Sequence, residues 1–212
     1  MKSQDIVVLL KLVSLHQHLR GVDQVHVGEG YPENQGWQGW ESSATEASLE
    51  PLPGKILAEA FSVRGLEASL GISKSEVNAS IQRSYQTGLA MKDRKSGYPK
   101  ANVRSLLEFI AHGLKYVFPA KPGAMVRGIP TAAAAPVLQG ELISASDYIC
   151  VWPDPHGSDM GQALSPLFRS VPHAVRRDPE LYATLALVDA IRLGKPRESN
   201  LARQLLEKRL NA

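Results

Sequence analysis

The stretch 62–88 constrains the fold of this chain more than any other part of the sequence. Ser62 is a suitable N-cap for a short helix whose apolar residues repeat at helical spacing and end at Leu70. Gly71 follows directly, at a point where a sharp turn with a positive φ costs least at glycine. Ile72 then supplies an apolar side chain between this helix and the next. The stretch therefore predicts two helices joined by a tight turn.

A second helix is predicted to begin at Ser73. Ser73 and Glu76 have the S-x-x-E spacing of a capping box, in which the two side chains satisfy backbone N–H groups reciprocally. Val77 and Ile81 lie four residues apart and predict the buried face of this helix, and Gly88 ends it. The two predicted helices together have the spacing of a helix-turn-helix unit.

The opposite face of the second helix carries short polar side chains, amides and cations. These candidate DNA-binding residues are Ser73, Lys74, Ser75, Asn78 and Gln82, with Ala79 among them and Arg83 on the flank. In a helix-turn-helix, the second helix presents such a face to base edges in the major groove. Amides and hydroxyls suit base edges, and cations suit phosphates. The pattern indicates a DNA-reading helix, although any solvated helix also has a polar face.

A short hairpin is predicted directly after this helix. Residues 89–91 and 101–103 can form two strands around the turn sequence KDRKSGYPK at 92–100. This turn carries the cations Lys92, Arg94, Lys95 and Lys100. A cationic hairpin in this position is typical of the wing of a winged helix, which contacts phosphates or the minor groove.

The segment LEASLGISKSEVNASIQRSYQTGLAM resembles the winged helix-turn-helix of MarR- and GntR-type bacterial regulators. The resemblance covers about 45 residues and implies a DNA-binding transcriptional regulator. One departure from the usual pattern is Glu67, which stands with Ala68 where a small residue is usual in the first helix.

Positive charge is concentrated in the same region. Residues 1–53 hold three Lys/Arg and seven Asp/Glu, a balance of −4. Residues 54–104 hold nine against four, a balance of +5, and residues 105–212 hold twelve against ten, a balance of +2. This distribution favours attraction of residues 54–104 to phosphate.

The whole chain is predicted to be an α+β protein in two parts. Residues 1–104 form the winged helix-turn-helix domain, with an apolar first helix and a loop insertion at about 21–53 that contains Trp37 and Trp40. Residues 105–212 form a smaller mixed α/β region, with a helix ending at Gly113, strands at 115–119 and 148–152, and two closing helices.

The first of the two closing helices has clear end signals, with Asp178 as its N-cap and Gly194 just beyond its last turn. A single winged-helix module rarely binds DNA tightly, so a homodimer is expected. The apolar first helix and the closing helices are its candidate interface.

The layout also resembles prokaryotic winged-helix proteins of the AbiEi antitoxin type, through the fragments HGLKYVFPAKPG, VRGIPTA and VDAIRLGKPRESNLARQLLEKRL. This resemblance implies an autoregulating antitoxin whose partner is a nucleotidyltransferase-like toxin.

Other sequence features give little support for catalysis, metal binding or a membrane span. His16 and His18 lie two apart on a helix and point in different directions, and the Asp154-Pro-His156 stretch lacks a nucleophile-elbow pattern. No phosphate-binding glycine motif, signal peptide or long apolar run is present, and a single Cys150 fits a reducing cytoplasm. We therefore expect a cytoplasmic protein that is not an enzyme and has no cofactor.

The sequence favours sequence-specific binding of double-stranded DNA as a transcriptional regulator. The alternative is a protein-interaction module that binds and neutralises a partner protein, with DNA binding secondary.

Overall fold

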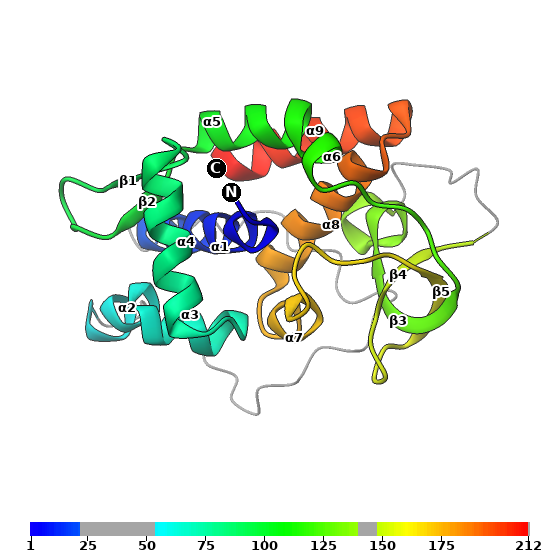
Figure 1. Cartoon of the computed structure of the whole chain (residues 1–212), viewed down its shortest axis with the longest axis horizontal. Coiled ribbons are helices and arrows are strands. Elements are labelled where there is room, and N and C mark those ends of the chain that lie inside the picture. The colour runs from blue at the N-terminus through cyan, green and yellow to red at the C-terminus, as the bar shows by residue number, and fades with distance from the viewer. Residues whose placement is uncertain (22–53, 140–147, 212) are drawn as a thin grey trace.

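The computed structural model describes residues 1–21, 54–139 and 148–211. Its helices are α1 (Ser3–Gly21), α2 (Gly54–Phe61), α3 (Val63–Leu70), α4 (Lys74–Gln86), α5 (Val103–Glu108), α6 (Leu114–Val117), α7 (Val171–Val175), α8 (Pro179–Leu193) and α9 (Pro196–Asn211), and its strands are β1 (Ala90–Lys92), β2 (Pro99–Ala101), β3 (Met125–Thr131), β4 (Cys150–Pro153) and β5 (Asp159–Ala163). The predicted α+β class is confirmed (Figure 1). Residues 22–53 of the predicted insertion, with Trp37 and Trp40, lie outside the described residues.

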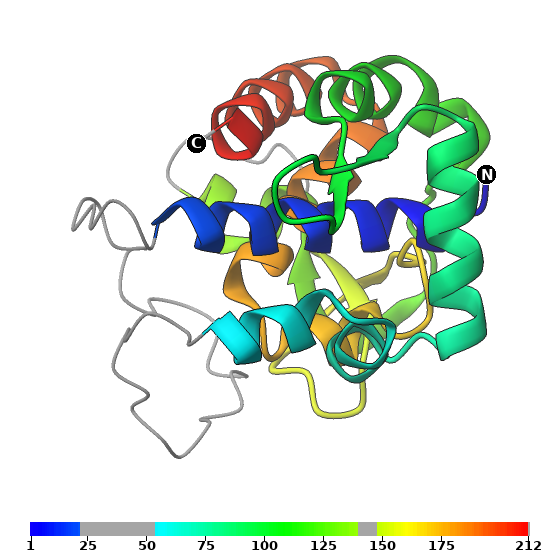
Figure 2. The ribbon, with the colours of Figure 1, turned by 90° about the vertical axis from the view of Figure 1, so that its left-hand side faces the viewer.

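Helix α1 crosses the centre of the molecule (Figure 2). The side chains of residues 6–10 are at most 1% exposed. This burial arises because α1 contacts α2, α3, α4 and β2 from the first half of the chain and α8 from the second half. A helix that is apolar all round has to be enclosed in this way. The expectation that α1 forms a dimer interface is therefore wrong, since a single chain already covers it. Among the described helices, none is long and apolar enough to cross a membrane.

One apolar core joins the two predicted parts of the chain. It runs from α1 and the α3–α4 pair to α8 and α9, so it includes side chains from both sides of residue 104. Helix α8 is buried over nearly its whole length and is likewise covered within one chain. The homodimer and the boundary at 104/105 stay predictions.

The helix that begins after the hairpin is longer than predicted. Asn102 caps α5 as expected, with its side chain accepting from the Ser105 N–H at 3.3 Å. Gly113, however, keeps a right-handed helical conformation inside a π-helical turn (Phe109–Gly113), and α6 continues to Val117. The predicted strand at 115–119 is therefore wrong. Leu106, Ile110 and Leu114 are fully buried at intervals of four residues, which favours continuation of the helix.

The three C-terminal strands form a small closed sheet. Strand β3 pairs antiparallel with both β4 and β5, which pair parallel with each other over two residues. This closure brings the backbone of β4 against Gly128 of β3, where a Cβ atom would lie 2.1 Å from the carbonyl oxygen of Trp152. The strand predicted at 148–152 is confirmed in its second half by β4.

A buried carboxylate joins this sheet to α8. Asp189 accepts from the Thr131 hydroxyl at 3.1 Å, from the Trp152 indole at 2.6 Å and from the Arg192 guanidinium. The same guanidinium donates to the carbonyls of Phe118 and Ser165. Because burial disfavours its charge, the pKa of Asp189 is raised above its ordinary value despite these donors. The group therefore fixes the C-terminal fold, and its donors leave it little capacity for other chemistry.

Candidate nucleic-acid interface

The α3–α4 pair forms as its sequence predicts. The Ser62 side chain accepts from the Gly65 N–H at 3.0 Å, and Gly71 adopts a left-handed conformation with φ of 63°. Leu70 and Ile72 on either side of the turn are at most 1% exposed. Gly65 allows α2 to pack closely, since a Cβ atom there would lie 2.2 Å from the carbonyl oxygen of Glu59. These contacts fix the start of α4, and the helix then crosses in front of α1 in the view of Figure 1.

The predicted capping box at the start of α4 does not form. Ser73 occupies the N-cap position, but its side chain makes no cap hydrogen bond. Instead, Glu67 of α3 accepts from the Lys74 N–H at 3.3 Å and pairs with the Lys74 ammonium at 3.6 Å. Glu76 turns away to the beginning of the chain, where it pairs with Lys2 at 3.2 Å. The unusual Glu67 thus satisfies one backbone N–H of the first turn of α4, a different one from the Glu76 N–H that the capping box assigned to Ser73.

Helix α4 has a buried face, and beyond its first turn its exposed face carries no charge. Its buried residues are Val77, Ser80, Ile81 and Ser84. The exposed polar residues Ser75, Asn78, Gln82 and Gln86 follow one another at intervals of three or four and so lie along one stripe of the helix. We call these four residues the amide stripe. The structure thus brings three predicted residues together, adds Gln86, and leaves Ala79 half-buried.

Arg83 points inward to α1. Its Nε and NH2 atoms donate to the two oxygens of Asp5 at 3.0 and 2.7 Å, and the Asp5 side chain is 0% exposed. Burial alone would raise the pKa of Asp5, but donors from Arg83 and the Lys2 backbone hold this pKa below its ordinary value. Arg83 therefore fixes α4 on α1, and its fork is already occupied by a carboxylate. The sequence gives no signal for a pair 78 positions apart.

The β1–β2 hairpin presents its cations to solvent. Its register pairs Ala90 with Ala101 and Lys92 with Pro99, so the strands lie within two residues of the predicted ones. Lys92, Arg94 and Lys95 are exposed and make no ion pair with any residue that the structure describes. Lys100 is half-buried and lies 3.5 Å from Asp93.

The hairpin turn is held by Asp93. Its carboxylate accepts from the Ser96 N–H and the Ser96 hydroxyl, both at 2.9 Å, and from the Lys95 N–H at 3.2 Å. These donors, led by the Ser96 N–H, place the pKa of Asp93 well below its ordinary value. Gly97 has φ of 74° and closes the turn. The turn therefore has a defined shape, which fixes where its three exposed cations emerge.

The base of the hairpin is anchored to α1 and α2. The rings of Phe61 and Tyr98 stack with centroids 4.7 Å apart, and the His16 ring contacts Phe61 edge-on. His16 also bonds to the carbonyl of Pro99 at 2.9 Å, while His18 bonds to the carbonyl of Ser14. The two histidines that the sequence pairs thus point to different partners. No group of three metal-ligating side chains occurs among the described residues.

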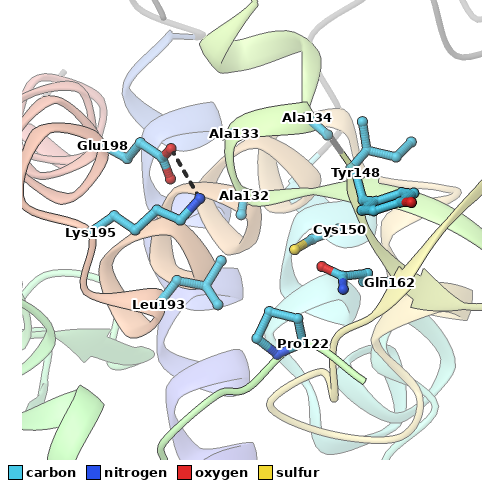
Figure 3. A pocket seen from close by; sticks show the side chains of 11 residues that line it. Pro122, Ala132, Ala133, Ala134, Tyr148, Cys150, Gln162, Leu193, Lys195 and Glu198 are labelled. Atoms are coloured by element: carbon cyan, nitrogen blue, oxygen red, sulfur yellow. Dashed lines mark ion pairs between the residues drawn. The ribbon is translucent and has the colours of Figure 1, made fainter. Parts of the chain in front are cut away.

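Two other places were candidates for chemistry. Asp154 accepts from Arg176 at 2.8 Å and from the His156 backbone, while the His156 side chain is exposed. A pocket of about 270 Å³ lies between β4, β5 and the α8–α9 connection. Lys195 and Glu198 point toward each other inside it, with Nζ and Oε1 3.6 Å apart (Figure 3).

This pocket offers weak means for catalysis. Most of its other lining is small or apolar, including Ala132, Ala133 and Leu193 (Figure 3). Burial raises the pKa of the Cys150 thiol and so reduces its thiolate population. The amide stripe and the hairpin remain the better candidate site.

Comparisons with protein-family models, with curated proteins and with solved structures returned no match. The function of the chain is therefore inferred from its own geometry.

Proposed function

We propose that this chain binds double-stranded DNA as a transcriptional regulator, with α3, α4 and β1–β2 acting as a winged helix-turn-helix. The observation that carries the proposal is the juxtaposition of two surfaces. The neutral amide stripe of α4 and the hairpin cations, which pair with none of the described residues, are contiguous in the chain and both face solvent.

The two surfaces suit two different parts of a DNA duplex. Asn78 and Gln82 offer amides that can make paired hydrogen bonds to adenine in the major groove, where base pairs are distinguishable. Lys92, Arg94 and Lys95 suit phosphates, which supply affinity independently of sequence. Arg83 is left out of this set because it is paired with Asp5.

The test is the salt dependence of binding to a random duplex of about 25 base pairs, followed by fluorescence anisotropy. The wild type should lose affinity steeply with salt, since each neutralised phosphate contributes about 0.9 to the slope of log K against log salt. The variant Lys92→Gln/Arg94→Gln/Lys95→Gln should lower this slope by roughly 2 to 3. The matched control is Arg197→Gln/Arg203→Gln/Lys208→Gln, which removes three exposed cations of α9.

A flat salt response of the wild type would refute DNA binding. Equal slopes for the hairpin variant and the α9 control would show that binding depends on net charge alone and would refute the assigned surface.

A second candidate function, binding of a partner protein, is favoured by one observation. Met125 and Arg127 on β3 pair with Gln162 and Met160 on β5, so these four side chains share one sheet face. Both methionines are about half exposed, at 47% and 55%. Under this hypothesis, Met125→Ser/Met160→Ser would abolish capture of a partner, while the duplex assay on the wild type would give no binding.

A further inference from the structure

A segment of the C-terminal part lies against the turn that begins α4. The Ser170 hydroxyl donates to the Leu70 carbonyl at 2.5 Å, across 100 positions of sequence. A Cβ atom at Gly71 would lie 3.1 Å from Cβ of Ser170 and 3.5 Å from Cδ2 of His173. Residues 169–173 therefore lie beside the turn that precedes α4, through the contacts of Ser170 and His173. We call them the α7 shoulder.

The backbone of the α7 shoulder is fixed by contacts with the rest of the C-terminal part. Pro172, Ala174 and Val175 of α7 are buried, and Arg176 is tied to Asp154 at 2.8 Å with only 14% of its side chain exposed. These contacts fix the backbone that carries Arg169 and His173. A backbone held in this way loses little conformational entropy when it binds a ligand.

Two polar side chains of the shoulder face solvent. Arg169 and His173 are both exposed, and the Arg169 guanidinium lies 6.0 Å from the centre of the Phe168 ring. Lys74, at the start of α4, is 55% exposed on the other side of the Gly71 turn. His173, and Arg169 next to Ser170 in the chain, therefore lie beside the turn that leads into α4, while Lys74 itself pairs with Glu67.

The hairpin occupies the other end. It follows the last turn of α4, and the Asn102 side chain donates to the carbonyl of Gly88 at 3.3 Å (Figure 1). Helix α4 has 13 residues and so spans about 20 Å. The major groove is about 12 Å wide between its phosphate ridges. Groups at both ends of α4 thus have the separation needed to reach the two ridges.

We infer that Arg169 and His173 bind phosphates of the DNA backbone on the side of the groove opposite to the hairpin. This inference rests on the proposed function and assigns a second, C-terminal part of its interface. The C-terminal part then sets the orientation of α4 on the duplex, because phosphate contacts at both ends of the helix fix its register.

The experiment uses the full chain and the same random duplex of about 25 base pairs at several salt concentrations. Arg169→Gln/His173→Gln should lower the salt slope by about 1 and weaken binding roughly tenfold at low salt. The matched control, Arg203→Gln/Lys208→Gln, removes two exposed cations of α9 and should change neither quantity. Urea unfolding of each variant should match the wild type, which shows that the fold is intact.

Other outcomes separate this inference from the proposed function. If the shoulder variant matches the α9 control while the hairpin variant loses slope, DNA binding stands and the shoulder is not part of the interface. If the wild type gives a flat salt response, both are overturned. If the double variant proves unstable, Arg169→Glu alone is used, and unchanged affinity for it overturns the inference.

Discussion

Helix α4 and the β1–β2 hairpin follow each other in the chain but use their charges in opposite ways. Each charged residue of α4 has a partner within the protein: Lys74 pairs with Glu67, Glu76 with Lys2, and Arg83 with Asp5. The hairpin leaves Lys92, Arg94 and Lys95 exposed, without an ion pair to the described residues. The charges of α4 thus position the helix, and those of the hairpin are available to a ligand.

Under the proposed function, this difference accounts for the neutral exposed stripe of α4. A helix that reads bases needs directional donors and acceptors, which amides supply, and it needs a fixed position. The Arg83–Asp5 pair supplies the position from the buried side. Under the same proposal, attraction to phosphate is left to neighbouring elements, so base reading and phosphate binding can be changed separately by mutation.

The largest expected effect, on the free energy of unfolding, comes from removing the inward-pointing charge of Arg83. Arg83→Ala leaves the Asp5 carboxylate buried without its main donor, which should destabilise the protein by about 3 kcal/mol. Urea unfolding at neutral pH measures this loss, and Arg203→Ala on the exposed face of α9 is the control. A loss below about 0.5 kcal/mol would be the value for an ordinary surface residue and would contradict a positioning role.

The next largest effect separates base recognition by α4 from the stability of the fold. Asn78→Ala/Gln82→Ala should reduce discrimination between a selected site and a random duplex by roughly 30-fold or more, since two amide–adenine pairs are lost and each is worth about 1–3 kcal/mol. Binding to random duplex and the urea midpoint should stay unchanged, because both side chains are exposed. The site is obtained by selection from a random duplex library. Discrimination that survives this change would assign base reading to another element.

A smaller effect appears only in acid. The pKa of Asp5 in the folded protein is held below its ordinary value of 3.8, so its charged form stabilises the fold above that pH. This contribution is lost as the pH falls below 3.8 and through the lower pKa of the folded state. Urea unfolding from neutral pH to about pH 2.5 should therefore show the gap between wild type and Asp5→Asn shrinking at the acid end. A constant gap would show that Asp5 is not the group responsible.

The smallest effect is expected from the outward charges. Lys92→Gln/Arg94→Gln/Lys95→Gln should change the free energy of unfolding by less than about 0.5 kcal/mol, as exposed cations without partners contribute little to stability. The same variant should lose most of its affinity for duplex DNA. A clear change in stability would mean that the hairpin cations have a role within the fold and would weaken the contrast with α4.

Sequence-based predictions were correct where a few neighbouring residues decide the structure. The Ser62 cap, the Gly71 turn and the buried Ile72 all formed as predicted. The start of α8 at Asp178 and its end at Gly194 were also predicted correctly, because caps and left-handed ends depend on hydrogen bonds within one helical turn.

Predictions failed where distant residues competed with a local signal. Glu76 fits a capping box by spacing, yet Lys2 and Gln4 bind its carboxylate. Gly113 fits a helix end, yet burial of Ile110 and Leu114 on one face of the helix favours its continuation. The spacing of residues along the sequence does not indicate these competing partners.

Local sequence is sufficient to specify the helix pair at 62–88 and the cationic hairpin after it, because the Ser62 cap, the turns and the apolar spacing involve residues only a few positions apart. Three other features depend on the closed fold: α1 lies at the centre, Arg83 turns to Asp5, and the α7 shoulder reaches the Gly71 turn. The last two join residues 78 and 100 positions apart. Such contacts form only when the core closes, so no periodic pattern in the sequence predicts them.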